Sequence, residues 1–268
     1  MGVQATVSAL MRQSVALMIA AAMLSPATAR ADRFATIERV RNSVVAIGTF
    51  ERTRSPQFQF LGTGFAVGDG STVVTNAHVL PPLLDSARSE IIAVVLPGRP
   101  KGAKEEAAEV REGRQIAVDP GTDLALLKIT GAALVPLRIR DSDSVREGQE
   151  VYFTGFPIGA VLGPFPATHR GMISVVTPIA IPQGRAADLD PRTLRRLATG
   201  SFPVLQLDAT AYPGNSGSPV YDPETGDVIG IINMVLVKGT KESALSQPSG
   251  ITYAVPSRHL QSLLDKAR

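Results

Sequence analysis

The chain has 268 residues, 44% hydrophobic and 19% charged, so it can bury a sizeable core and does not have the composition of a disordered chain. It has no cysteine, which excludes disulfides, thiolate metal sites and a cysteine nucleophile, and it has only three histidines (His78, His169, His259). The formal charge is +3, but residues 32–268 carry only +1, which gives no reason to expect nucleic acid or an acidic membrane as a partner.

Residues 1–31 are typical of a secretory signal peptide. Arg12 ends the charged n-region, and the apolar run Val15–Leu24 follows it. Ten apolar residues are too few to cross a hydrocarbon core, which takes about 20. Ala29-Arg30-Ala31 then supplies the small-x-small cleavage pattern. An uncleaved anchor is the alternative interpretation.

The location of the mature chain follows from this signal. The first ten residues are uncharged, so translation from Met11 rather than Met1 would give a more compact signal. Cleavage leaves residues 32–268, with no integral membrane segment after it. Export without cysteine favours a bacterial periplasmic or secreted protein.

Short apolar runs separated by glycine and proline dominate the mature chain, and they predict an all-β fold after one short helix. Phe34, Ile37 and Val40 have helical spacing and predict a helix over Phe34–Arg41. The whole chain has 24 Gly and 20 Pro, and many short apolar runs separated by such turn residues favour a sandwich or barrel. The predicted strands are Ser43–Phe50, Leu61–Val67, Thr72–Thr75, Ile91–Leu96, Gln115–Val118, Leu124–Ile129, Val151–Phe153, Met172–Pro178, Val204–Asp208, Val220–Tyr221, Val228–Val237 and Ile251–Ala254.

Two polar stretches interrupt the strands, and a second helix closes the chain. Gly98–Gly113 is predicted to be a surface loop, and Pro182–Ser201 to be either a solvated helical excursion or a regulatory loop. The closing helix over Ser257–Ala267 places Leu260, Leu263 and Leu264 on one face, and Ser257 can cap its N-terminus.

Three segments carry candidate catalytic chemistry. His78 follows a β-branched strand, Asp123 begins an apolar strand, and Ser216 lies in a Gly-Asn-Ser-Gly turn, at separations of 45 and 93 residues. A serine hydroxyl is a poor nucleophile near neutral pH and needs an imidazole to take its proton. The imidazole in turn needs an acceptor on its other nitrogen, which a carboxylate provides. Each residue alone is weak support, and the joint occurrence in this order favours a serine nucleophile.

The serine turn can also stabilise the intermediate of such a reaction. Its backbone N–H groups at Gly214 and Ser216 are candidate donors to an oxyanion. Gly214 permits a backbone conformation that a side chain would obstruct, and Gly217 leaves room for the substrate. His169, in a polar stretch, and His259, in the closing helix, are predicted to be surface residues. Three histidines so far apart do not predict a metal site.

The chain resembles the trypsin-like (chymotrypsin-fold) serine proteases, and among them the periplasmic HtrA/Deg proteases. The resemblance implies two antiparallel six-stranded β-barrels, about 32–140 and 141–254, with a C-terminal helix over 256–267. It implies His78 as general base, Asp123 as its orienting acid and Ser216 as nucleophile. Beyond those three, the segments that carry it are Val40–Ile47, Gly62-Thr63-Gly64-Phe65, Gly155-Phe156-Pro157, Arg170–Ser174, Gln206–Ala209, Gly230–Asn233 and Ile251–Pro256.

The chain also departs from that family's pattern. Val79 stands where animal trypsin-like enzymes have cysteine, and Ser218 replaces a glycine of the serine turn. That variant turn resembles the glutamyl endopeptidases, but Ile232 stands near the place of their carboxylate-binding histidine, so acidic specificity is not expected. Many Deg proteases carry PDZ domains after the protease. The sequence ends at the predicted closing helix, so we expect no PDZ domain.

The resemblance also implies a primary specificity pocket. Its base would be Thr210, and its wall would include Ile231, Ile232 and Asn233. None of these is acidic, so a basic side chain would be buried there without a partner. We expect an uncharged, small to medium aliphatic residue at the P1 position of the substrate.

Together these features predict an exported serine endopeptidase that cleaves unfolded or misfolded proteins through an acyl-enzyme. No cofactor or metal is expected, the partners are polypeptide substrates, and a homo-oligomer, a trimer, is implied by resemblance only. One alternative is a protease-fold binding or chaperone-like module with a resting or vestigial site. Another is a serine esterase of a different fold, which needs a Gly-x-Ser-x-Gly elbow and the order Ser, Asp, His, both absent here.

Overall fold

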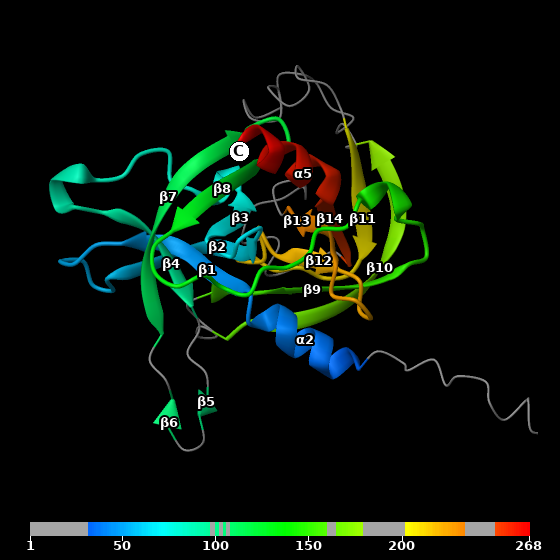
Figure 1. The fold of residues 1–268 in the computed structure, drawn as a ribbon, viewed down its shortest axis with the longest axis horizontal. Coiled ribbons are helices and arrows are strands. Elements are labelled where there is room, and N and C mark those ends of the chain that lie inside the picture. Colours follow the sequence, from blue (N-terminus) through cyan, green and yellow to red (C-terminus); the bar gives the residue numbers. More distant parts are fainter. Residues whose placement is uncertain are drawn as a thin grey trace, which may run out of the picture. The chain divides into compact units, whose positions relative to one another are not determined.

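Two closed antiparallel β-barrels make up most of the described structure (Figure 1). The computed structural model describes residues 32–96, 100–101, 104–105, 108–159, 165–178, 202–233 and 250–268. The first barrel has the strand order β1-β2-β3-β8-β7-β4 and the second β10-β11-β14-β13-β12-β9. The predicted all-β fold of two six-stranded chymotrypsin-like barrels with short terminal helices is confirmed.

The strand bounds lie close to the apolar runs of the sequence. The first barrel consists of β1 (Val44–Phe50), β2 (Phe58–Val67), β3 (Thr72–Asn76), β4 (Ile91–Leu96), β7 (Glu109–Asp119) and β8 (Leu124–Ile129). The second consists of β9 (Glu150–Gly155), β10 (Ala167–Pro178), β11 (Pro203–Asp208), β12 (Pro219–Tyr221), β13 (Val228–Ile232) and β14 (Ile251–Pro256). Short 3-10 turns lie at η1 (Ala77–Val79), η2 (Ser86–Arg88) and η3 (Ser142–Ser144).

Strand β1 shows why several strands are apolar on both faces. Val45 and Ile47 point into a core inside the first barrel, whereas Val44 and Ala46 belong to a second core. That second core also contains Phe156, Ile231 and other residues of the second barrel, so it lies between the barrels. Successive strand residues point to opposite faces, and both faces of β1 are therefore buried. Burial of each such aliphatic side chain contributes about 1.5–3 kcal/mol.

The polar stretch predicted as a loop over Gly98–Gly113 is partly strand. A small hairpin of β5 (Pro100–Lys101) and β6 (Lys104–Glu105) lies within it, and β7 already begins at Glu109. The prediction was wrong there because β7 is defined by pairing with β4 and β8 rather than by apolar content. Three predicted segments lie outside the described residues: residues 1–31, Pro182–Ser201, and the part of the predicted strand Val228–Val237 beyond Asn233.

Helix α2 (Arg33–Arg41) precedes the first barrel in sequence but contacts the second. Arg33 forms an ion pair with Glu150 of β9 at 2.9 Å, and the Arg39 guanidinium donates to the Thr225 carbonyl at 2.6 Å. Thr36 and Val40 are the buried residues of the helix. Phe34, predicted on the apolar face, is 85% exposed, because the buried face runs through Thr36 instead.

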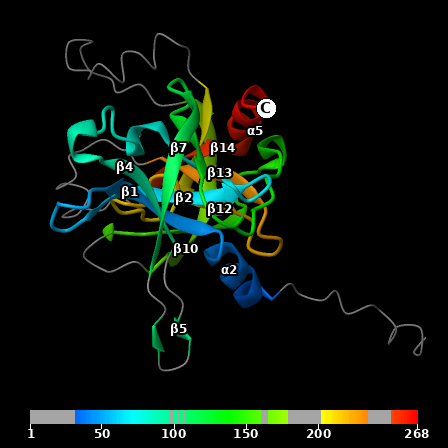
Figure 2. The same cartoon turned by 60° about the vertical axis from the view of Figure 1, so that its left-hand side comes forward.

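Helix α5 (Ser257–Lys266) follows the second barrel and contacts both barrels. It packs against β7 and β8 as well as β13 and β14, and Figure 2 shows it beside β14. Leu260 and Leu263 are buried as predicted, and Leu264 is partly buried. The predicted cap at Ser257 was wrong. Its hydroxyl donates to the Arg140 carbonyl, and the first-turn N–H of Arg258 donates to the Ser142 hydroxyl at 3.2 Å instead. Neither α2 nor α5 is long and apolar enough to cross a membrane.

The linker between the barrels is hydrogen-bonded to both of them. The carbonyl of Arg138 accepts from the Val228 N–H at 2.8 Å, and the Val228 carbonyl accepts from the Arg140 N–H at 2.9 Å. The Arg138 guanidinium also donates to the Asp227 carboxylate at 2.7 Å and lowers the pKa of that carboxyl. On the other side, the N–H groups of Leu134 and Leu137 donate to the Gly70 and Ala66 carbonyls of the first barrel, both at 2.9 Å. The linker is therefore bonded to both barrels where they meet.

Candidate active site

The end of β3 and the start of β8 bring His78 and Asp123 together. β3 pairs with β8 so that Asn76 lies opposite Leu124, and η1 carries His78 just beyond this pair. The Asp123 carbonyl accepts from the Ala77 N–H at 2.9 Å and from the Asn76 side-chain amide at 3.1 Å. Asp123 has φ +59°, a left-handed conformation that non-glycine residues rarely adopt and that tertiary contacts must maintain.

His78, Asp123 and Ser216 form a continuous hydrogen-bonded chain. The Nδ1 atom of His78 lies 2.5 Å from Oδ2 of Asp123, and its Nε2 atom lies 3.0 Å from Oγ of Ser216. The His78 backbone N–H donates to the other carboxylate oxygen at 3.0 Å, which fixes the carboxylate plane. An acceptor on Nδ1 holds the proton there and leaves Nε2 free to accept from the serine hydroxyl.

Asn233 completes the surroundings of the buried carboxylate. Its side-chain amide donates to Oδ2 of Asp123 at 2.8 Å, and both residues are nearly inaccessible. A buried charge is costly unless hydrogen bonds compensate it. Sequence reasoning assigned Asn233 to the wall of the specificity pocket. The structure shows its amide in contact with the acid, across 110 residues of sequence, and its place in a pocket wall stays a prediction.

The serine turn is held by donors outside it. The Ile158 N–H donates to the Pro213 carbonyl at 2.7 Å. Thr63 donates twice, through its hydroxyl to the Gly214 carbonyl at 2.7 Å and through its N–H to the Ser216 carbonyl at 2.8 Å. Gly214 has φ +102°, and a Cβ there would lie 2.3 Å from the Phe156 carbonyl, so only glycine fits. Among the described residues, the N–H groups of Gly214 and Ser216 have no acceptor, which leaves them available to a ligand.

Ser218, which departs from the family pattern, packs behind the turn. It is fully buried, and a Cβ on Gly155 would lie 1.9 Å from its hydroxyl oxygen. Real Cβ atoms do not approach so closely. The serine at 218 and the glycine at 155 therefore occupy complementary volumes.

The four residues predicted to form the specificity pocket have different environments. Ile231 and Ile232 are completely buried, one in the core between the barrels and one in the core of the second barrel. Thr210 keeps some exposed surface. Its neighbours are fixed by Thr252, whose hydroxyl donates to the Ala209 carbonyl at 2.6 Å and accepts from the Ala211 N–H at 3.1 Å. A pocket based on Thr210 stays a prediction.

The other two histidines are half-buried, contrary to the prediction of surface residues. His169 stacks on Phe153 with ring centroids 4.7 Å apart, because β10 begins at Ala167 and pairs with β9 there. His259 contacts the ring of Phe202 at 4.7 Å. Desolvation lowers the pKa of both imidazoles. Neither contacts the His78 chain in the described hydrogen bonds, and no group of three or more His, Asp or Glu side chains among the described residues could hold a metal ion.

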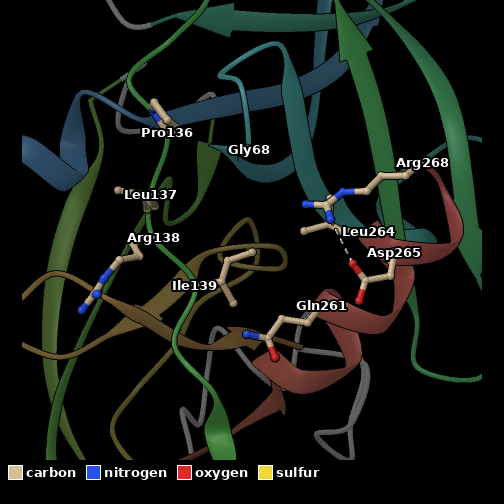
Figure 3. A pocket seen from close by; sticks show the side chains of 9 residues that line it. All are labelled: Gly68, Pro136, Leu137, Arg138, Ile139, Gln261, Leu264, Asp265 and Arg268. Carbon is tan, nitrogen blue, oxygen red and sulfur yellow. Dashed lines mark ion pairs between the residues drawn. The ribbon is translucent and has the colours of Figure 1, made fainter.

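A separate pocket of about 600 Å³ lies between the linker and α5 (Figure 3). Leu137 and Ile139 of the linker line one side, and Gln261 and Leu264 of α5 line the other. Asp265 and Arg268 form an ion pair at 3.5 Å at its edge. It contains none of the residues predicted from the sequence to be catalytic.

Comparison with known proteins gives a consistent family. The model for a trypsin-like peptidase domain matches residues 62–231, more than half of the chain. A protein of Marinomonas sp. (strain MWYL1) named "Probable periplasmic serine endoprotease DegP-like" is 31% identical over 208 residues, covering 78% of this chain and 35% of that protein. A relative of the same name from Ectopseudomonas mendocina (strain ymp) is 29% identical over 204 residues, covering 76% and 34%.

A solved structure described as "HtrA-type protease AlgW with tripeptide" superposes with a TM-score of 0.58 at 23% identity, covering 87% of this chain and 62% of that one. The likeness shows that the two share the fold. The chain spans about a third of the length of the curated relatives above. On the match to the domain model, the chain belongs to the trypsin-like peptidase family.

Proposed function

We propose that the chain is an exported serine endopeptidase that works through an acyl-enzyme. The observation that carries this proposal is the hydrogen-bonded chain from Asp123 through His78 to Ser216, next to two backbone N–H groups that have no acceptor in the described part of the chain. Membership of the trypsin-like peptidase family supports it. In this proposal Ser216 is the nucleophile, His78 the general base, and Asp123 the residue that orients the imidazole.

The proposed reaction moves one proton in each half. His78 Nε2 takes the proton of Ser216 Oγ as that oxygen attacks the substrate carbonyl carbon. The imidazolium then gives the proton to the departing amine, and the peptide bond breaks to leave an ester on Ser216. Water attacks that ester with His78 again as base, which releases the carboxylic acid and restores the serine.

The oxyanion formed in both halves needs donors that are fixed in advance. We assign the N–H groups of Gly214 and Ser216 to this role, since neither has an acceptor among the described residues. In a trans peptide the C=O and N–H point in opposite directions. The hydrogen bond from Ile158 N–H to the Pro213 carbonyl therefore turns the Gly214 N–H away from Ile158. Loss of one such donor typically costs 10²–10³ in kcat.

The substrate is proposed from the relatives. Proteins named as DegP-like periplasmic endoproteases are similar over three quarters of this chain, and a fold relative was solved with a tripeptide. We propose that unfolded or misfolded envelope polypeptides are the substrates. The signal-like residues 1–31 support export. The absence of an acidic residue at Thr210 supports an uncharged P1 residue.

The test is digestion of denatured casein by the purified protein beside its Ser216→Ala variant. We expect cleavage by the first and a loss of about 10⁶ in kcat for the second. The cleavage sites should follow uncharged residues. Equal cleavage by both proteins would refute Ser216 as nucleophile. Cleavage by neither, together with suppression of aggregation by both, would favour the binding or chaperone-like module instead.

A further inference from the structure

Thr63 touches the serine turn at three positions, although it belongs to the other barrel. It lies on β2, where pairing with Ala46 of β1 fixes its backbone, and it is fully buried. Its N–H donates to the Ser216 carbonyl at 2.8 Å and its hydroxyl to the Gly214 carbonyl at 2.7 Å. A Cβ on Gly217 would lie 2.0 Å from the Thr63 carbonyl, so the backbones are in close contact there.

The hydroxyl of Thr63 has a defined direction. A hydroxyl has one hydrogen to donate and two lone pairs to accept with. The Phe156 N–H donates to Thr63 Oγ1 at 3.1 Å, so the hydroxyl hydrogen is left for the Gly214 carbonyl. The hydroxyl thus links the chain after β9 to the serine turn. The same stretch of chain, through Ile158, holds the Pro213 carbonyl.

Gly214 is the residue most in need of this support. Glycine can adopt many backbone conformations, and φ +102° is only one of them. The peptide before Gly214 is held by Ile158, and the peptide after it is held by the Thr63 hydroxyl. Without the second bond, the Gly214–Asn215 peptide keeps only the hydrogen bond from its Asn215 N–H to the Tyr212 carbonyl at 3.0 Å, and its carbonyl has no described hydrogen bond. This peptide lies between the peptide that carries the Gly214 N–H and the peptide that carries the Ser216 N–H. A change in its orientation would therefore change how the two N–H groups that we assign to the oxyanion are placed relative to each other.

We propose that the Thr63 hydroxyl is a positioning group for catalysis, which holds the Gly214 peptide in the conformation that binds the oxyanion. This inference rests on the proposed function. It concerns the transition state rather than the ground state, because the oxyanion forms only during reaction. Removal of the hydroxyl should therefore lower kcat and leave KM nearly unchanged.

The experiment compares Thr63→Val, Thr63→Ser and the control Thr154→Val. Thr154 is also fully buried and its hydroxyl also makes two hydrogen bonds, to Thr168 and Tyr221, neither of which belongs to the serine turn. The readouts are kcat and KM on a chromogenic peptide, with active sites counted by a fluorophosphonate. We expect Thr63→Val to lose about 10-fold to 100-fold in kcat per active site. Thr63→Ser and Thr154→Val should keep kcat.

Three results would overturn the inference. They are full kcat in Thr63→Val, an equal loss in Thr63→Ser, and an equal loss in Thr154→Val. If Thr63→Val does not fold, Thr63→Ala takes its place. If the unaltered protein shows no turnover that depends on Ser216, the proposed function fails, and hydrogen exchange of residues 212–217 decides the inference. Exchange must then be faster in Thr63→Val than in Thr63→Ser and Thr154→Val, and equal rates would refute it.

Discussion

Asn233 offers a quantitative test of how the buried carboxylate is supported. Its amide donates to Oδ2 of Asp123 at 2.8 Å, the same oxygen that lies 2.5 Å from His78 Nδ1. A hydrogen bond to a charged group contributes about 1.5–3 kcal/mol. Asn233→Ala should therefore lower the free energy of unfolding by about 2 kcal/mol, which for a chain of this size lowers Tm by about 4–8 °C.

The same substitution should lower activity, because a less fixed carboxylate orients His78 less well. If the lost bond acts fully in the transition state, kcat/KM falls about 10-fold to 100-fold. Asn233→Asp has the same shape but places a second carboxylate beside Asp123, so its loss should be larger. Thermal unfolding by circular dichroism and kcat/KM on a chromogenic peptide measure the two effects. The reasoning would be refuted if Asn233→Ala kept the Tm and kcat/KM of the unaltered protein. It would also be refuted if Asn233→Asp were more active than Asn233→Ala.

Two further predictions concern packing and pH. Gly155→Ala should destabilise the fold, because its Cβ would lie 1.9 Å from Ser218 Oγ. Adding Ser218→Gly should restore part of the decrease in Tm. If Tm is not restored, the close approach of residues 155 and 218 is not the cause of the destabilisation. Burial against Phe202 lowers the pKa of His259, so folding favours the neutral imidazole. The stability that the neutral form provides is complete above the ordinary pKa of about 6.5. It is lost as the pH falls through the lowered pKa of the folded protein. Between pH 7.5 and pH 5, the Tm of His259→Leu should therefore decrease less than the Tm of the unaltered protein. Equal decreases in Tm would contradict this prediction.

The centres of the strands could be predicted because burial leaves a local pattern. Ile91–Leu96 and Leu124–Ile129 have the bounds expected from their apolar runs. β7 was missed at its start because Glu109 and Val110 are exposed there and only pairing with β4 makes the segment a strand. His169 was misplaced for the same reason, since its burial depends on Phe153 across the β9–β10 pair.

The residues that we propose as reactive, His78, Asp123 and Ser216, could be singled out because the proposed chemistry restricts residue type and order. The residues that support them could not. Asn233 and Thr63 act through hydrogen bonds to residues 110 and 151 positions away, and nothing in the adjacent sequence distinguishes a supporting amide or hydroxyl from any other. Only the packing of one barrel on the other reveals them.

Each of the two terminal helices contacts the barrel at the other end of the chain. α2 precedes the first barrel yet contacts Glu150 and Thr225 of the second, and α5 follows the second yet packs on β7 and β8 of the first. Cleavage of the linker would thus give two fragments, each with a terminal helix that contacts the barrel of the other fragment. Since the proposed residues His78 and Asp123 would belong to one fragment and Ser216 to the other, we expect that neither fragment would cleave a peptide bond alone. Mixed together, the fragments would recover activity only on reassociation, so this scaffold is suited to serve as a split reporter.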